Sequence, residues 1–176
     1  MQYRRVYVPG GTYFFTVNLA DRSQTLLVDH IDDLRDAVQN VLTSHPFCID
    51  VMVVLPDHLH AIWTLPEGDA NYPMRWSLIK AGFSRCIPAD EQRSKSRIAK
   101  GERGIWQRRY WEHLIRDEQD YMNHVNYIHY NQVKHGHVAR VADWPYSTFH
   151  QAVKNGQYPP DWSEEPIFQV NANKYE

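Results

Sequence analysis

The chain has 176 residues, a hydrophobic content of 43% and a formal net charge of −2 at pH 7. This length suits a single domain with its own core, which we place at residues 1–162 with a tail at 163–176. The sequence lacks an apolar run of eighteen or more residues and a signal-peptide core, so we expect a cytoplasmic protein with no membrane partner.

The first half of the chain predicts a strand, a helix and two further strands. Gly10 and Gly11 precede an aromatic and β-branched segment that is typical of a strand. Farther on, Leu34 and Val38 belong to a pattern of apolar residues at helical spacing. Two apolar runs are then separated by Pro56, as in a hairpin. The predicted elements are a strand at 12–19, a helix at 31–44, and strands at 47–54 and 58–65.

The second half predicts a helix, a strand and C-terminal helices. The polar, basic stretch at 87–104 has few apolar residues, so we expect a flexible loop there, and a poorly ordered tail from Tyr158. The predicted elements are helices at 69–86, 117–135 and 145–153 and a strand at 106–115. The order β-α-β-β-α-β is that of the ferredoxin-like split βαβ arrangement, an α+β fold with a four-stranded antiparallel sheet and helices on one face.

The predicted strand at 58–65 begins with the triplet His58-Leu59-His60. Side chains alternate along a strand, so both histidines lie on one face with Cα atoms about 7 Å apart. Two imidazoles at that spacing can share a divalent metal ion. Two histidines that hydrogen-bond or face solvent would produce the same pattern.

The predicted helix at 117–135 carries a tyrosine on its polar side. Asn123, Tyr127, Asn131 and Lys134 are spaced by four, four and three residues, which places them along one stripe of a helix. Such a stripe is also typical of a solvated helix face. Gln132 is the neighbouring amide and points about 100° away around the helix.

The small net charge conceals a basic central segment. Residues 75–116 contain eleven basic and four acidic side chains, whereas the flanking segments 1–74 and 117–176 are both acidic. Cations interleaved with aromatic rings can neutralise phosphates and stack unpaired bases, although a solvated loop could have the same composition. Our candidate DNA-binding residues are Arg4, Arg5, Arg75, Lys80, Arg93, Lys95, Arg97, Lys100, Arg103, Arg108, Arg109 and Lys134.

Several long stretches carry a resemblance to a known family. They include Gly10–Leu19, Val54–Pro66, Tyr110–His113, Val133–Gly136 and Asp143–His150. Over residues 3–162 the chain resembles the REP-associated tyrosine transposases, which are relatives of the single-tyrosine HUH transposases of bacterial insertion sequences. The shared stretches are rich in Trp and His, so the resemblance is specific.

The resemblance implies an HUH nuclease fold and a catalytic site. The family's nucleophile corresponds to Tyr127, and its histidine pair corresponds to His58 and His60. Its third metal ligand, glutamine in many relatives, corresponds to the shorter Asn131. The implied cofactor is Mg²⁺ or Mn²⁺.

The resemblance also implies a reaction on DNA. The expected substrate is single-stranded DNA of repetitive extragenic palindrome hairpins, cleaved and transferred through a 5′-phosphotyrosine, by a monomeric enzyme associated with the nucleoid. A dimer is the alternative assembly. A non-cleaving architectural binder of the same hairpins and a zinc hydrolase unrelated to DNA are the alternative functions.

Overall fold

The computed structural model describes residues 5–166, so the predicted DNA-binding residue Arg4 and positions 167–176 of the predicted tail lie outside the described residues. Four strands form one sheet, and the helices surround it. The strands are β1 (Thr12–Asn18), β2 (Cys48–Val54), β3 (His58–Thr64) and β4 (Trp111–Leu114). The helices are α1 (Leu26–Asp29), α2 (Ile31–Ser44), α3 (Tyr72–Cys86), α4 (Lys95–Ala99), α5 (Glu118–Lys134), the 3₁₀ helix η1 (Val141–Asp143) and α6 (Phe149–Lys154).

The sheet has the strand order β2-β3-β1-β4, and every neighbouring pair is antiparallel. In the register of the two central strands, Asn18 pairs with His58 and Thr16 pairs with His60. This order is that of a split βαβ fold. The predicted α+β class with a four-stranded antiparallel sheet is therefore confirmed.

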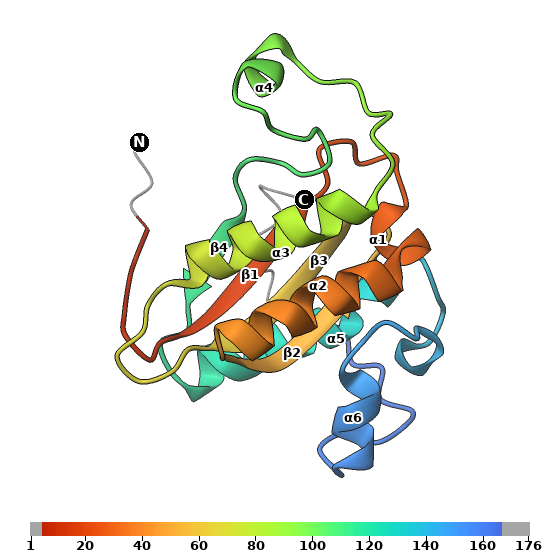
Figure 1. Ribbon diagram of the computed structural model, residues 1–176. Helices are drawn as coiled ribbons and strands as arrows, with labels where there is room; N and C mark the ends of the chain where they lie inside the picture. Colours follow the sequence, from red (N-terminus) through yellow and green to blue (C-terminus); the bar gives the residue numbers. More distant parts are fainter. Residues whose placement is uncertain (1–4, 167–176) are drawn as a thin grey trace.

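Helices cover both faces of the sheet. Figure 1 shows α2 and α3 across the front, where they pack on the larger core around Phe15, Leu59 and Trp63. Helix α5 lies behind the sheet, on a smaller core that includes Phe14 and Ile62. The prediction had placed helices on one face with extra C-terminal helices. The structure shows that the first C-terminal helix closes the second face.

The central strand β3 is buried at every residue except the last, Thr64, because both of its faces are covered. Leu59, Ala61 and Trp63 point toward α2 and α3, whereas the alternate residues His58 and His60 lie on the α5 side. The apolar core is thus on one face of this strand and the two histidines are on the other.

The segment after α5 covers the free edge of β2. The backbone N–H of Val54 donates to the carbonyl of Tyr146, and the N–H of Thr148 donates to the carbonyl of Met52. The predicted poorly ordered tail is partly ordered, because Tyr158 and its neighbour Trp162 pack their rings against Phe149 of α6. A protected edge cannot pair with another chain.

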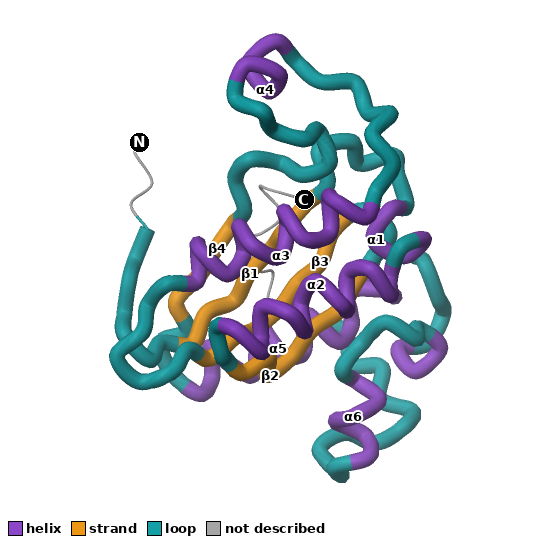
Figure 2. Tube along the Cα trace, in the orientation of Figure 1, coloured by secondary structure: helices purple, strands orange, loops and turns teal. Residues whose placement is uncertain are grey.

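The long connection between α3 and β4 is also ordered, contrary to our prediction of a flexible loop. Figure 2 shows this excursion above the sheet, with α4 at its tip. Arg103 stabilises it by donating to the carboxylate of Glu91 and to the carbonyls of Ser84, Ile87 and Pro88. Within the described part of the chain, none of the helices combines the length and apolarity needed to cross a membrane.

Candidate active site

The candidate site begins with the histidine pair on β3. Their rings are buried, and the ring centroids lie 5.0 Å apart. The Nδ1–H of His58 donates to the carboxylate of Asp57 at 2.8 Å, which leaves the lone pair on Nε2. Nδ1 of His60 and the hydroxyl of Thr16 are hydrogen-bonded at 2.9 Å. In each ring Nε2 is therefore the nitrogen that could bind a metal.

The turn before β3 holds His58 in this orientation. Asp57 forms an ion pair with Arg22, and its carbonyl accepts from the N–H of Leu19 at the end of β1. Burial opposes ionisation of Asp57, but the contacts with His58 and Arg22 outweigh burial and lower its pKa. Burial lowers the pKa of His58 to about 4. The imidazole is thus neutral at pH 7, as a metal ligand must be.

Helix α5 carries the tyrosine over the histidine pair. Asp117 caps the helix by accepting from the N–H of Asp120. Ten residues into α5, the ring of Tyr127 lies 5.3 Å from the ring of His60, whereas that of His135 lies 5.1 Å from the ring of His58. Asn131 is halfway between these two contacts, at the four-residue spacing that keeps side chains on one helix face. The buried side chain of Asn131 therefore belongs to the face of α5 that packs over the histidine pair.

The site contains buried polar atoms that the described residues leave without a hydrogen-bond partner. These atoms are Nε2 of His58 and both the oxygen and nitrogen of the Asn131 amide. Buried polar atoms in proteins are normally paired with protein, water or an ion. Two imidazole nitrogens and an amide oxygen form a donor set that could hold a divalent metal ion. Gln132 is directed elsewhere, since its amide donates to the carbonyl of Val141.

The hydroxyl of Tyr127 has a cation beside it. Nζ of Lys134 donates to this oxygen at 3.2 Å and lies 4.8 Å from the ring centroid. An ammonium group in this position stabilises negative charge on the phenolic oxygen. The other two tyrosines of α5 lie elsewhere: Tyr121 packs on the smaller core, and Tyr130 is half-buried on another side of the helix.

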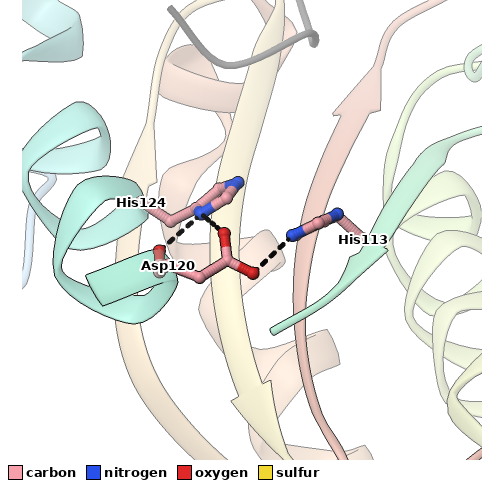
Figure 3. A group of neighbouring side chains, drawn as sticks. All are labelled: His113, Asp120 and His124. Carbon is pink, nitrogen blue, oxygen red and sulfur yellow. Dashed lines mark hydrogen bonds and ion pairs between the residues drawn. The ribbon is translucent and has the colours of Figure 1, made fainter. Parts of the chain in front are cut away.

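A second polar cluster joins β4 to α5, and sequence reasoning had missed two of its members, Asp120 and His124, although a hydrogen-bonding role had been expected for His113. Figure 3 shows the carboxylate of Asp120 between the rings of His113 and His124. Its Oδ2 accepts from Nε2 of His113 at 2.8 Å and from the backbone N–H of Arg116 at 3.0 Å. Nδ1–H of His124 points at the Asp120 carbonyl at 2.7 Å. The spacing of Asp120 and His124, four residues on one helix, was the available signal.

These three residues could hold a metal ion, since their ligand atoms all lie within 4.8 Å of one another. However, the atoms already hydrogen-bond directly, and the Arg116 guanidinium donates to the same carboxylate. A positively charged neighbour disfavours a bound cation. The cluster therefore fits a hydrogen-bonded connection between β4 and the tyrosine helix. His124 also packs its ring on Phe14, 4.7 Å away, and Phe14 in turn contacts Tyr127.

Two of the predicted DNA-binding residues have structural roles instead. Arg75 is 2% exposed, pairs with Asp69, and donates to the carbonyls of His45, Pro46 and Asn71. Arg103 is engaged with Glu91 and the loop carbonyls described above. Their guanidinium donors are occupied inside the protein. We therefore no longer count Arg75 and Arg103 among the residues that contact DNA.

The other predicted DNA-binding residues remain available at the surface or in a cavity. Arg5, Lys80 and Arg97 are half-buried and line one cavity beside α3. The exposed ones are Arg93, Lys95, Lys100, Arg108, Arg109 and Lys134. Five of these six belong to the connection between α3 and β4, so this connection carries most of the exposed predicted cations.

Comparisons with known proteins agree with this geometry. The REP-associated tyrosine transposase of Escherichia coli strain K12 is 49% identical over 162 residues, which are 92% of this chain and 90% of that protein. A Haemophilus influenzae relative with the same family name is 46% identical over 172 residues, covering 97% of this chain and 98% of its own. No protein-family profile matches the chain.

A solved structure with the same fold is that of a REP-associated tyrosine transposase bound to a REP hairpin. It superposes with a TM-score of 0.84 at 46% identity, covering 98% of this chain and 96% of that chain. The fold and these relatives define the chain as a tyrosine transposase, an enzyme class that acts on DNA. Within this class, the chain belongs to the REP-associated tyrosine transposases.

Proposed function

We propose that the protein is a metal-dependent single-stranded DNA endonuclease and strand transferase that acts on repetitive extragenic palindrome hairpins. The observation that carries the proposal is the position of Tyr127 over His60, one helical turn before the buried amide of Asn131. A nucleophile and a divalent-metal donor set then converge on one point of the sheet. The relative solved with a REP hairpin supports hairpin DNA as the partner.

In the proposed reaction, Tyr127 is the nucleophile. Its phenolic oxygen attacks the scissile phosphorus, an O–P bond forms, and the bond from phosphorus to the 3′ oxygen breaks. The phenolic proton is lost to solvent and the leaving 3′ oxygen takes up a proton from solvent, so the products are a 5′-phosphotyrosine and a strand with a free 3′-OH. Attack by a 3′-OH in the reverse direction rejoins DNA without ATP, because the covalent bond conserves the phosphodiester energy.

The residues around Tyr127 prepare it for attack. A phenol with an ordinary pKa near 10 is a poor nucleophile at pH 7. The ammonium of Lys134 stabilises negative charge on the attacking oxygen. Packing of the Tyr127 ring on His60 and Phe14 fixes the direction of the hydroxyl.

His58, His60 and Asn131 would hold the metal ion. When bound, Mg²⁺ or Mn²⁺ neutralises the non-bridging phosphate oxygens and the charge on the leaving oxygen. The site lies between the sheet and α5, so a scissile phosphate has to approach the sheet closely, which favours an unpaired strand over a duplex. We propose a monomer in the cytoplasm with the chromosomal DNA.

Incubation of a labelled REP hairpin with the protein and Mn²⁺ tests the proposal. We expect a covalent protein–DNA adduct with the wild type and none with Tyr127→Phe, which removes one oxygen and keeps the ring. Tyr130→Phe is the matched control and should retain activity within about tenfold. Retardation of the hairpin without any adduct would instead identify an architectural binder.

A further inference from the structure

A second basic site lies on the face of the sheet that does not carry Tyr127. A cavity of about 720 Å³ opens between α3 and the connection that leads to β4. Lys80 on α3, Arg97 on the connection and Arg5 near the N-terminus line it together with the aromatic rings of Trp106 and Tyr110. Cavities of this size accept small ligands or parts of a polymer.

The ammonium group of Lys80 is the central cation of this cavity. It donates to the carbonyl of Gln107 at 3.0 Å and lies 5.2 Å from the ring centroid of Tyr110 and 5.7 Å from that of Trp106. No carboxylate of the described residues forms an ion pair with it. Burial and the positive charge of Arg5 and Arg97 lower the pKa of Lys80 to about 8.

The nearby charges leave the cavity with excess positive charge. Within residues 5–166, the guanidinium of Arg97 donates to the carbonyls of Arg103 and Trp106. Glu102, which also lines the cavity, is paired with Arg108 at 2.7 Å. Glu112 lies 3.5 Å from Arg5. Glu102 and Glu112 are thus paired with Arg108 and Arg5. Unlike Arg75 and Arg103, neither Lys80 nor Arg97 forms an ion pair with a carboxylate of the described residues, so their charge remains for an anion from outside.

We propose that this cavity binds a backbone phosphate of the unpaired strand that flanks the hairpin. Lys80 and Arg97 would contact the phosphate oxygens, and Arg5 would enclose them from the other side. The guanidinium of Arg5 lies 4.5 Å from the ring centroid of Tyr110 and donates to its hydroxyl at 3.1 Å, so a cation and an aromatic ring, the two groups that bind unpaired strands, lie together at the cavity. The inference rests on the proposed function, since it extends the DNA path away from Tyr127.

The cavity connects to the catalytic face through one pair of residues. Gln107 lines the cavity, and its side chain accepts from Nδ2 of Asn18 at 3.4 Å. Asn18 is the cross-strand partner of His58. A DNA strand that leaves the catalytic site at this end of the sheet therefore reaches the cavity within a few nucleotides. A small anion would need no such continuity, so the geometry favours nucleic acid.

The test measures binding without catalysis. Labelled hairpins with and without a single-stranded flank are titrated with protein in EDTA at several salt concentrations. Lys80→Met removes the charge but keeps the chain length. Lys154→Met is the matched control, because that lysine is exposed on α6, which lies well away from α3 and α4 in Figure 1.

We expect Lys80→Met to weaken binding of the flanked hairpin about threefold to tenfold, and to reduce the slope of log affinity against log salt by about 0.7, the value for one single-strand phosphate. The bare hairpin and the Lys154→Met protein should show no change. Equal losses with both hairpins, or unchanged affinity, would overturn the inference. Should Lys80→Met not fold, Arg97→Gln provides the same test.

Inorganic phosphate separates the two possible sources of the anion. Phosphate at millimolar concentration should not raise the melting temperature of the wild type more than that of Lys80→Met. A Lys80-dependent increase, with DNA binding unchanged, would identify a site for a free anion and overturn the inference. If the wild type binds neither hairpin, the proposed function itself fails. Adduct formation by Tyr127 is measured separately, so the two failures are distinguishable.

Discussion

The buried carboxylate of Asp120 should be one of the largest single contributors to stability on the tyrosine helix. We expect Asp120→Asn to lower the free energy of unfolding by about 3 kcal/mol at pH 7. The carboxylate is 5% exposed and accepts from His113 and from two donors of Arg116. Charge-assisted hydrogen bonds contribute about 1.5–3 kcal/mol each, and an amide of equal size would leave at least one N–H donor facing its own NH₂ group.

The effect should depend on pH with a definite sign. Burial opposes ionisation of Asp120, but the hydrogen bonds from His113 and Arg116 outweigh it and lower the pKa of the carboxyl. A carboxyl with a lowered folded-state pKa stabilises the protein above its unfolded pKa, near 3.8, and loses this contribution as the pH falls through the folded pKa. The difference between wild type and variant should therefore be constant from pH 7 to 5 and shrink below pH 4.

Urea unfolding followed by circular dichroism measures both predictions. Asp117→Asn is the matched control, since Asp117 is an exposed cap in the same turn and Asn caps helices equally well. The control should cost less than about 0.5 kcal/mol. If Asp120→Asn costs no more than Asp117→Asn, the cluster of Figure 3 does not hold α5 on the sheet, and our account of how Tyr127 is positioned fails.

Three further outcomes are expected. His58→Ala should weaken Mn²⁺ binding at least about tenfold in a calorimetric titration, whereas the control His30→Ala should bind Mn²⁺ as the wild type does. Equal Mn²⁺ affinities of His58→Ala and wild type would remove His58 from the metal site. Arg75→Met should lower the free energy of unfolding by about 3 kcal/mol or more, because the carboxylate of Asp69 loses its buried partner. The folded variant should bind DNA normally. A stable variant with weakened DNA binding would show that Arg75 does contact DNA. Affinity for the flanked hairpin should fall as the pH rises from 7 to 9, because the pKa of Lys80 is about 8 and its ammonium loses its charge over this range. Lys80→Met should abolish this dependence.

The sheet and the two elements that carry the site could be predicted from periodicity, whereas their meeting was implied only by the family resemblance. Alternation along 58–65 places His58 and His60 on one face, and four-residue spacing places Tyr127 and Asn131 on one side of a helix. The observed bounds of β3 and α5 lie within one residue of the predicted ones. Which face of the sheet α5 covers could not be predicted in this way. Periodicity shows which side of a single helix or strand is apolar, but not which other element packs against that side.

The roles of individual cations were the least predictable part. Arg75 and Lys80 have the same charge and lie five residues apart on one helix, yet Arg75 is enclosed by carbonyls whereas Lys80 lines an open cavity. The difference arises from the loop at His45 and from the connection after α3, both distant in sequence. The order of that connection likewise depends on the pairing of Glu91 with Arg103, twelve residues apart. Long-range pairs of this kind leave no periodic signal in a single sequence.

The most direct measurement of the central claim is the chemical identity of the residue that becomes joined to DNA. The covalent adduct formed with a REP hairpin in Mn²⁺ would be digested with protease and nuclease, and the modified peptide sequenced by mass spectrometry. We predict a nucleotide attached through its 5′ phosphate to the phenolic oxygen of Tyr127. Attachment to Tyr121 or Tyr130, or through a 3′ phosphate, would contradict the account.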